Sequence, residues 1–244
     1  MSLHRFLVPS ESWSAGRVAF SGEQAHQLRA VLRLGAGSRV RAFDGQRPRD
    51  YVVELVSAAE GRIVDELAQP AEPRTRLIAY PSLLPRDRFE SVLQKLTEVG
   101  AGAIVPVLTR RSVVREPPDE RRLARWRAIL REATEQSGRG CLPQLAQPQP
   151  FERAVLSAPG TRLLAYAGEP GTGLRAALAG AEDTGTVSLF VGPEGDFDPD
   201  EVRLAREAGA TMVSLGPRIL RAETASPVFA ALVLYELEGR IRGS

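Results

Sequence analysis

Hydrophobic and polar positions follow two different patterns along the chain, and the change falls near residue 70. Before it, short segments alternate apolar with polar residues, which is typical of half-buried β-strands. The predicted strands are Arg17–Phe20, Arg39–Phe43, Tyr51–Val56 and Gly61–Val64. A single helix is predicted among them, over Glu23–Leu34. Several short strands and one helix predict a small β-barrel-like domain over residues 1–70.

The segment Gln69–Arg74 is predicted to be a linker, because its prolines continue neither a strand ladder nor a helix. From residue 75 to 244, strands alternate with helices, which is typical of a parallel α/β sheet. The predicted strands are Leu77–Tyr80, Ala103–Leu108, Arg162–Tyr166, Val187–Val191 and Met212–Leu215. The predicted helices are Asp87–Val99, Asp119–Gln136, one from Asp198 to Gly209, and Ser226–Gly239.

Two of these helices carry clear end signals. Gly100 stands where a left-handed residue commonly ends a helix. Asp198 is predicted to be an N-cap, with Pro199 in the first helical position and Glu201 completing a capping box. In a parallel sheet, ligands bind at the carboxyl ends of the strands, so the loops that leave those ends are the candidate sites.

The first candidate loop is Gly192–Phe197, which joins a predicted strand to the capped helix. It is neither a dinucleotide fingerprint nor a phosphate-binding P-loop. The carboxylates Glu194, Asp196 and Asp198 also argue against a bound pyrophosphate. Its position favours a ligand loop, although a plain turn with a well-capped helix accounts for the same residues.

The second candidate loop, Leu215–Ala225, carries Arg218, Arg221, Glu223 and Thr224 between a buried strand and a buried helix. An Arg–Glu pair two residues apart is often a solvated ion pair of little consequence. Its place at a strand end, beside the first loop, favours a functional role.

Two further segments are polar. Glu132–Pro143 contains Glu135, Gln136, Ser137 and Arg139 at the end of a predicted helix, where the helix dipole alone accounts for the arginine. Leu108–Ser112 places Arg110 and Arg111 at a strand end, where they either contact phosphate or form a solvated rim.

The charge composition adds one feature. Of the 32 basic residues, Lys95 is the only lysine, so 31 are arginines, while the net charge is only +2. GC-rich codon usage accounts for this bias, and so does recognition of phosphates and bases, for which the planar guanidinium is well suited. With the net charge so low, any basic binding surface has to be a local patch.

Several classes of protein are excluded. One cysteine, Cys141, forms no intramolecular disulfide, and with His4 and His26 it makes no ordinary zinc site. No histidine follows Cys141, so a buried structural thiol is favoured over a nucleophile. No apolar run spans a membrane, and the N-terminus lacks the features of a signal peptide. We therefore predict a cytoplasmic protein without a metal site.

The two loops together resemble the signature of the SPOUT (trefoil-knotted) methyltransferases, and more narrowly the RsmE family, which methylates ring nitrogen 3 of a uridine in bacterial 16S ribosomal RNA. The carrying motifs are Gly192-Pro-Glu-Gly-Asp-Phe197 and Leu215-Gly-Pro-Arg-Ile-Leu-Arg-Ala-Glu-Thr-Ala225. The supporting motifs are Gln94–Gly100, Pro106–Ser112, Glu132–Pro143 and His26–Arg33. The chain departs from the family at Asp196, where the family usually has a second glycine, and mildly at Ser226–Pro227.

The resemblance implies a fold and a cofactor. The fold is α/β, with a SPOUT-type parallel sheet and a C-terminal trefoil knot over residues 75–244, a rare exception to the absence of knots. Residues 1–70 are implied to be a PUA-like RNA-binding barrel, and the enzyme a homodimer. The cofactor is S-adenosylmethionine, and its implied binding residues are Leu164, Ala165, Tyr166, Gly192, Pro193, Glu194, Gly195, Leu215, Gly216, Ile219 and Leu220.

For catalysis we predict that Arg221 stabilises the charge that develops on a uridine carbonyl. Glu223 either accepts the proton or orients Arg221, and His26 is interpreted as an RNA contact or a structural residue rather than as the base. The predicted RNA-binding residues are Arg5, His26, Arg29, Arg33, Arg110, Arg111 and Arg139. The partner is 16S ribosomal RNA or the small ribosomal subunit.

Three other functions stay open at this point. A knotted enzyme of the same class methylates a ribose 2′-hydroxyl, and a non-catalytic RNA-binding assembly factor retains the fold without the cofactor. A nucleotide-phosphate hydrolase is disfavoured, because the Gly192–Phe197 loop has no lysine and an acidic flank.

Overall fold

The computed structural model describes residues 3–67, 72–168, 172–179, 181 and 185–241. The chain forms two compact units, Met1–Glu72 with Arg131–Leu142, and Pro73–Leu130 with Pro143–Ser244. The first unit thus includes residues 131–142, which the sequence analysis assigned to the second domain. Of the predicted linker, residues 69–71 lie outside the described part of the chain.

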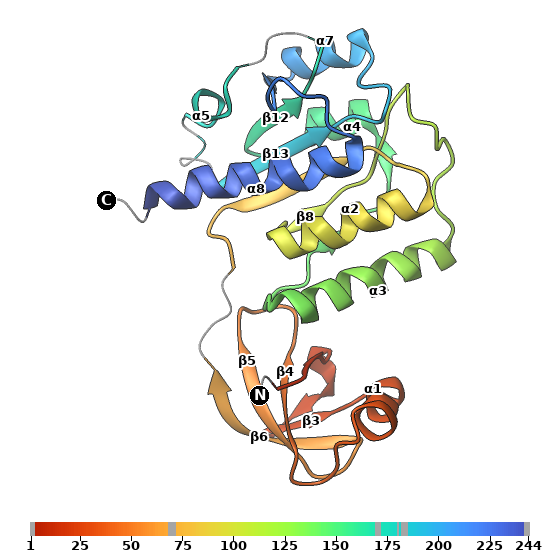
Figure 1. Cartoon of the computed structure of the whole chain (residues 1–244), viewed down its shortest axis with the longest axis vertical. Coiled ribbons are helices and arrows are strands. Elements are labelled where there is room, and N and C mark those ends of the chain that lie inside the picture. Colours follow the sequence, from red (N-terminus) through yellow and green to blue (C-terminus); the bar gives the residue numbers. More distant parts are fainter. Residues whose placement is uncertain (1–2, 68–71, 169–171, 180, 182–184, 242–244) are drawn as a thin grey trace. The chain divides into compact units, whose positions relative to one another are not determined.

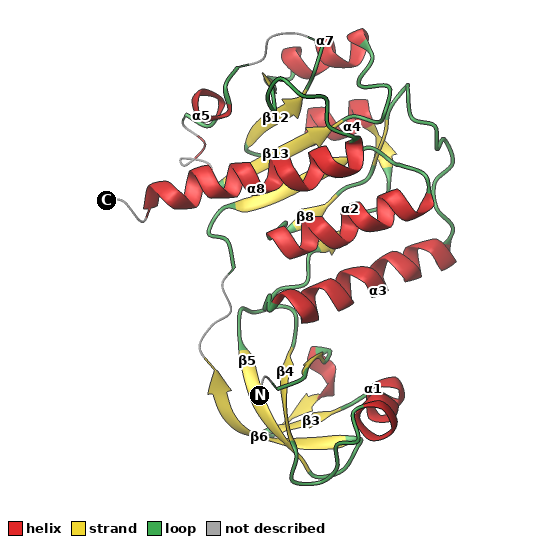
Figure 2. Cartoon of the chain, viewed as in Figure 1, coloured by secondary structure: helices red, strands yellow, loops and turns green. Residues whose placement is uncertain are grey.

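The N-terminal unit is built on a six-stranded sheet, seen in yellow in Figure 2, whose order is β1-β4-β5-β6-β3-β2. The pair β1–β4 is parallel and the other neighbours are antiparallel. The bounds are β1 Arg5–Leu7, β2 Trp13–Ser14, β3 Arg17–Ala19, β4 Arg39–Phe43, β5 Asp50–Leu55 and β6 Glu60–Leu67. The four predicted strands are confirmed, while the short β1 and β2 were not predicted.

The helix predicted over Glu23–Leu34 is shorter and irregular. It consists of α1, Gly22–His26, followed by one π-helical turn, Gln27–Val31. Ser21 caps α1, because its hydroxyl accepts a hydrogen bond from the Gln24 backbone N–H and the Gln24 side chain accepts from the Ser21 N–H. The chain then leaves the helix through Arg33, whose positive φ of 57° ends the regular repeat.

The C-terminal unit contains a six-stranded sheet with the order β10-β8-β7-β13-β12-β14. Every neighbouring pair is parallel, which confirms the predicted parallel α/β sheet. The strands are β7 Arg76–Pro81, β8 Ala103–Ile104, β10 Gln144–Leu145, β12 Thr161–Ala165, β13 Thr186–Val191 and β14 Thr211–Val213. The helices are α2 Arg86–Val99, α3 Glu120–Ser137, α4 Phe151–Ser157, α5 Leu174–Ala177, α7 Pro199–Glu207 and α8 Ala222–Ile241.

Apolar side chains bury this sheet on both faces, as parallel strands require. Alternate residues such as Tyr80, Leu164 and Phe190 join one core cluster with α4 and α7. On the opposite face, α2 and α8 lie side by side (Figure 1), and α8 packs on β7 and β13. The two helix layers leave the carboxyl ends of the strands and their loops as the polar edge of the unit.

The structure corrects two further predicted elements and adds two helices. The strand predicted over Ala103–Leu108 is interrupted before Pro106, which has no N–H for a ladder, and its second part, β9 Val107–Leu108, pairs with β11 Gln149–Pro150 instead. The last helix begins at Ala222 rather than Ser226, so Pro227 lies inside it. The helices α4 and α5 were not predicted. The other predicted helices are confirmed, including the left-handed Gly100 at φ 119° that ends α2.

In the described residues, no helix is both long and apolar enough to cross a membrane. The same residues contain no group of three or more His, Cys, Asp or Glu side chains placed to hold a metal ion.

Candidate active site

Three strand ends of the C-terminal unit meet at one pocket of about 260 Å³. The loops that leave β12, β13 and β14 all line it, together with the first turn of α8. The lining residues are Ala165, Tyr166, Ala167, Val191, Gly192, Pro193, Glu194, Asp196, Ser214, Leu215, Gly216, Arg218, Ile219, Leu220, Arg221, Ala222 and Ala225. The two candidate loops thus share one pocket at the carboxyl edge of the parallel sheet.

The Gly192–Phe197 loop is held on its outer side by two arginines. Arg88 of α2 donates to the Glu194 carboxylate at 2.5 Å. Arg111, which follows β9, donates to the carbonyl oxygen of Gly195 at 3.0 Å. The loop is therefore anchored to the helix layer and to the loop after β9.

The start of the same loop needs a glycine. A Cβ atom at Gly192 would lie 3.2 Å from both the Asp196 carboxylate and the Phe197 backbone nitrogen. Such a contact is tighter than carbon atoms normally tolerate, so the close turn between β13 and Asp196 depends on the missing side chain. Phe197, fully buried in the core, closes the loop from below.

The N-terminus of α7 confirms the predicted capping box. The Asp198 carboxylate accepts from the Asp200 N–H at 3.1 Å, and Glu201 accepts from the Asp198 N–H at 2.9 Å. The second oxygen of Glu201 accepts from the Arg110 N–H at 2.9 Å. Burial raises the pKa of Glu201 even though these two hydrogen bonds act against the shift. The cap therefore links the pocket loop to the segment after β9.

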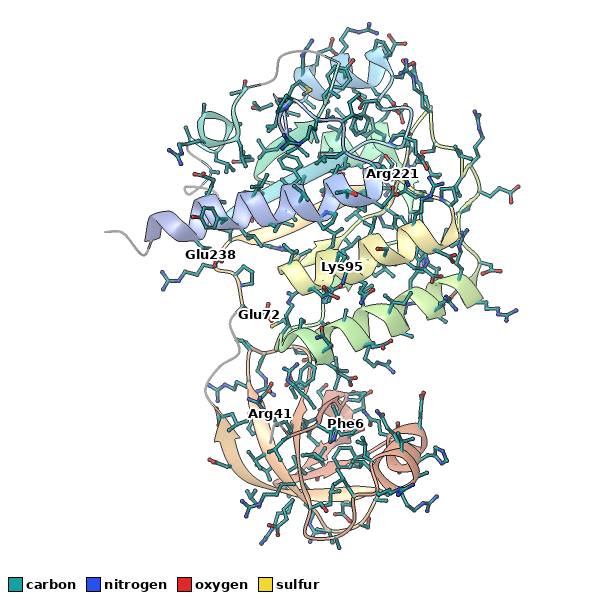
Figure 3. The ribbon with its side chains drawn as sticks, viewed as in Figure 1. Phe6, Arg41, Glu72, Lys95, Arg221 and Glu238 are labelled. Atoms are coloured by element: carbon teal, nitrogen blue, oxygen red, sulfur yellow. The ribbon has the colours of Figure 1, made fainter. Side chains whose placement is uncertain are left out.

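Arg221 and Glu223 stand at the start of α8, where Figure 3 shows Arg221 at the N-terminal end of the helix. The Arg221 side chain is 82% exposed and its Nη1 lies 3.9 Å from the nearer Glu223 oxygen. Arg221 lines the pocket, whereas Glu223 does not. The other Glu223 oxygen is buried and has no hydrogen-bond partner among the described residues. The structure thus places the arginine at the pocket and the carboxylate behind it.

Most of the predicted cofactor-binding residues lie in the pocket wall. The exceptions are Leu164, which is fully buried in the core beneath it, and Gly195, which turns outward toward Arg111. The pocket wall also contains residues that were not predicted to bind the cofactor, namely Val191, Asp196, Ser214, Ala222 and Ala225. Their positions at the carboxyl ends of predicted strands, or directly after those ends, could have marked them as pocket residues. Roles for the lining residues as cofactor ligands stay predictions.

Two of the arginines predicted to bind RNA are held inside the N-terminal unit. Arg5 is only 8% exposed, and its guanidinium donates two hydrogen bonds of 2.7 Å to the buried Asp50 carboxylate. It also donates to the backbone carbonyls of Thr134 and Arg139. The Arg139 side chain, 5% exposed, pairs with Glu72 at 2.8 Å. Because their guanidinium groups are occupied within the fold, we omit both from the proposed RNA-binding set.

The remaining predicted RNA contacts are accessible. His26, Arg29 and Arg33 are exposed on the N-terminal unit. Arg110 and Arg111 are about half exposed, although each faces an acidic partner, Asp200 and Asp198 respectively. Cys141, predicted to be buried, is half-buried, and burial together with the nearby Glu72 raises the pKa of its thiol.

The pocket wall combines apolar side chains and exposed loop backbone with two carboxylates and two arginines. Such a lining suits an organic ligand that has both apolar and polar parts.

Comparisons with known proteins agree on one family. The pattern of the RNA methyltransferase domain matches residues 71–234. The ribosomal RNA small subunit methyltransferase E of Synechocystis is 34% identical and covers 96% of this chain and 78% of its own length. The Bacillus subtilis enzyme of the same name is 28% identical and covers 95% of both chains.

Solved structures point the same way. The methyltransferase E of Neisseria gonorrhoeae, bound to S-adenosylmethionine, has a TM-score of 0.81 and 31% identity, covering 96% of this chain and 98% of its own. A Legionella pneumophila protein in complex with the same cofactor has a TM-score of 0.84 and 27% identity, covering 97% and 98%.

Proposed function

The chain belongs to the ribosomal RNA small subunit methyltransferase E family, and from that membership we propose that it transfers a methyl group from S-adenosylmethionine to ring nitrogen 3 of a uridine in 16S ribosomal RNA. One observation on this chain's own structure supports the proposal. The loops after β12, β13 and β14 converge on a single pocket with Arg221 at its rim.

The pocket residues fit the cofactor. The apolar residues Leu215, Ile219 and Leu220 offer a surface for its adenine ring, and the loop backbone around Gly192 and Gly216 lies open to its polar groups. Bound there, the cofactor supplies an electrophilic methyl group on a sulfonium ion. The protein's task is to place the uridine in line with that methyl.

Ring nitrogen 3 of uridine carries a proton that has to leave before or during attack. Holding the nitrogen and the methyl group in line contributes about 7–11 kcal/mol of the barrier, whereas a general base contributes about 10²- to 10⁴-fold in rate. Positioning is therefore the larger effect. The target uridine has to be unpaired or flipped out, because base pairing uses the same nitrogen.

Arg221 is proposed to stabilise the negative charge that spreads onto a uridine carbonyl oxygen. The variant Arg221→Lys keeps the charge but loses the planar pair of donors. We expect its kcat to fall by about 10²-fold at unchanged cofactor affinity. A kcat within a few-fold of the wild type would rule out this role.

Glu223 is proposed either to accept the proton or to orient Arg221, with which it shares the start of α8. The pH–rate profile of Glu223→Gln separates the two roles. Loss of the acidic limb identifies Glu223 as the base, and a retained acidic limb leaves it the orienting role.

RNA binding is proposed to involve His26, Arg29, Arg33, Arg110 and Arg111, with affinity that falls steeply with salt. The N-terminal unit is proposed to be a PUA-like barrel, which its mainly antiparallel six-stranded sheet supports. The C-terminal unit is proposed to carry the trefoil knot of the SPOUT class, and the enzyme to act in the cytoplasm, where ribosomes assemble.

A homodimer is proposed on α8. Val228, Ala231, Leu232 and Tyr235 follow one another at helical spacing, and Leu232 and Tyr235 are 40% and 76% exposed. An apolar stripe on the outer side of a helix is typical of an interface. Sedimentation velocity of Tyr235→Glu tests it: the variant is expected to be monomeric, and an unchanged dimer contradicts this interface.

The activity itself is tested by mass spectrometry of 16S ribosomal RNA nucleosides from cells with and without the gene. Loss of 3-methyluridine in the deletion strain, restored by the wild type but not by Arg221→Ala, is the expected result. Loss of a ribose-methylated nucleoside instead identifies a 2′-O-methyltransferase. Unchanged methylation, together with no binding of S-adenosylmethionine by calorimetry, identifies an RNA-binding assembly factor.

A further inference from the structure

Asp196 stands where the family usually has glycine, and the structure shows what its side chain does. Its backbone has a positive φ of 58°, a conformation natural to glycine and tolerated by aspartate. The carboxylate turns back over its own loop, where Oδ1 accepts from the Phe197 N–H at 2.8 Å. The family's backbone turn is thus kept while a side chain is added.

The second carboxylate oxygen leaves the loop altogether. Oδ2 of Asp196 accepts from the backbone N–H of Ala167 at 3.3 Å. Ala167 belongs to the loop after β12, whereas Asp196 belongs to the loop after β13. Both residues line the pocket, so one side chain joins two of its walls.

In the described parts of these two loops, no other hydrogen bond joins one loop to the other. Each loop is otherwise held by contacts elsewhere. The outer side of the Gly192–Phe197 loop is held by Arg88 and Arg111. Tyr166, just before Ala167, donates its N–H to Val213 of β14. Asp196 therefore supplies the cross-connection on the ligand side.

We propose that Asp196 is a positioning residue that clamps the loops after β12 and β13 together and so preorganises the cofactor pocket. The inference rests on the proposed binding of S-adenosylmethionine in this pocket. Without the clamp, the ligand itself has to order the two walls, and the ordering lowers its affinity. A glycine at this position would make no such bridge, so the bridge depends on the Asp196 side chain.

Three substitutions separate the bridge from the backbone conformation. Asp196→Asn tolerates the positive φ but replaces one of the two acceptor oxygens with an NH2 donor, so either the Phe197 or the Ala167 N–H loses its acceptor. Asp196→Gly removes the bridge and accepts the φ freely, whereas Asp196→Ala removes the bridge and keeps the strained φ. Asp200→Asn, an exposed carboxylate on the next helix outside the pocket, is the matched control.

The dissociation constants of S-adenosylmethionine and S-adenosylhomocysteine are measured by calorimetry on the full-length protein. We expect all three Asp196 variants to bind both ligands about three- to tenfold more weakly, the value of one lost hydrogen bond. KM for the cofactor rises by the same factor, and kcat at saturating cofactor stays within about twofold. The control binds as the wild type does. The midpoint of thermal unfolding is expected to be higher for the Gly variant than for the Ala variant.

Three results would overturn the clamp. The first is wild-type affinity in Asp196→Asn and Asp196→Gly. The second is weak binding in the Ala variant alone, which would make backbone strain the cause. The third is weaker binding of S-adenosylmethionine but not of S-adenosylhomocysteine, which would make Asp196 a direct counter-charge to the sulfonium. If the wild-type protein binds neither ligand, the proposed function itself is refuted. That outcome is distinguishable from the three above, in which the wild type binds and only the variants are compared with it.

Discussion

The two units of this protein differ in where they hold their arginines and carboxylates. Beside its apolar core, which includes Phe6, the N-terminal unit buries two ion pairs: Arg5 with Asp50, which is 1% exposed, and Arg139 with Glu72. Figure 3 labels Phe6 and Arg41, which both belong to this unit. In the C-terminal unit the sheet is covered by apolar side chains on both faces, and the carboxylates and arginines collect in the loops at the strand ends.

This difference shows that an arginine's sequence neighbourhood does not reveal its role. A buried ion pair costs desolvation energy that only good geometry and extra hydrogen bonds offset, and Arg5 has both, because it also lies 3.6 Å from the centre of the Phe43 ring. Arg221, by contrast, is largely exposed at a pocket. The first type of arginine holds a fold together, and the second type is available to a ligand.

The largest expected effect is on the buried charges. Arg5→Ala leaves Asp50 buried beside Arg41, whose Nε lies 3.4 Å from the Asp50 carboxylate. We expect the free energy of unfolding in urea to fall by about 3–5 kcal/mol. Arg17→Ala, which removes the exposed Arg17–Glu60 pair of the same unit, should cost far less, because solvent screens that pair. Equal losses in the two variants would contradict the distinction.

The apolar unit is tested at Phe190, a fully buried ring of β13 that stacks on Tyr80 with 4.3 Å between the ring centres. Phe190→Leu removes that stacking and leaves a small void. We expect a loss of about 1–2 kcal/mol in the urea unfolding free energy. Leu156→Ala, on the exposed side of α4, should stay within about 0.5 kcal/mol. Equal losses of unfolding free energy at Leu156 and Phe190 would contradict the assignment of Phe190 to the core of this unit.

Two exposed arginines of the N-terminal unit are compared by RNA binding. Arg29→Ala should lower the slope of log K against log salt by about 1, since one phosphate contact is lost. Arg17→Ala, an exposed arginine already paired with Glu60, should leave the slope unchanged. Filter binding to 16S ribosomal RNA at several salt concentrations measures both. A slope unaffected by Arg29→Ala would remove this residue from the proposed surface.

The smallest effect concerns Glu135, whose Oε1 accepts from the Leu7 N–H at 2.7 Å. Burial raises the pKa of Glu135 in the folded protein, against the opposing influence of Arg131 and Arg5. Its stabilising contribution is therefore complete below the unfolded-state pKa of about 4.3 and is lost as the pH rises through the folded-state pKa. Glu135→Gln keeps the acceptor without the charge.

Thermal unfolding of Glu135→Gln should accordingly show a higher midpoint than the wild type at pH 7, with the difference vanishing near pH 4. A variant that is less stable than the wild type at pH 7 would show that the ionised carboxylate is required, and would reverse the sign of this argument.

Local sequence signals predicted much of the fold. The strand Arg39–Phe43 and the capped start of α7 were read correctly, because alternation and capping act between residues a few positions apart. The two-residue strands β8 and β9 were predicted as one continuous strand. They are separate because β8 pairs with β7 whereas β9 pairs with β11, and this choice of partners cannot be predicted from the local sequence around Pro106. The start of α8 was placed four residues late because Pro227 read as a first-turn residue.

What the sequence determined by itself is the order of elements, the parallel sheet and the two loops that line the pocket, because these depend on residue spacing and on the chirality of parallel connections. Only the tertiary structure decided which arginines are buried, that Glu223 lies behind Arg221, and that Asp196 reaches Ala167. The burial of Arg5 and the contact of Asp196 with Ala167 depend on residues that lie 134 and 29 positions apart in the chain. The place of Glu223 depends on where α8 begins. Contacts over such separations produce no periodic pattern in the sequence, so the sequence does not predict them.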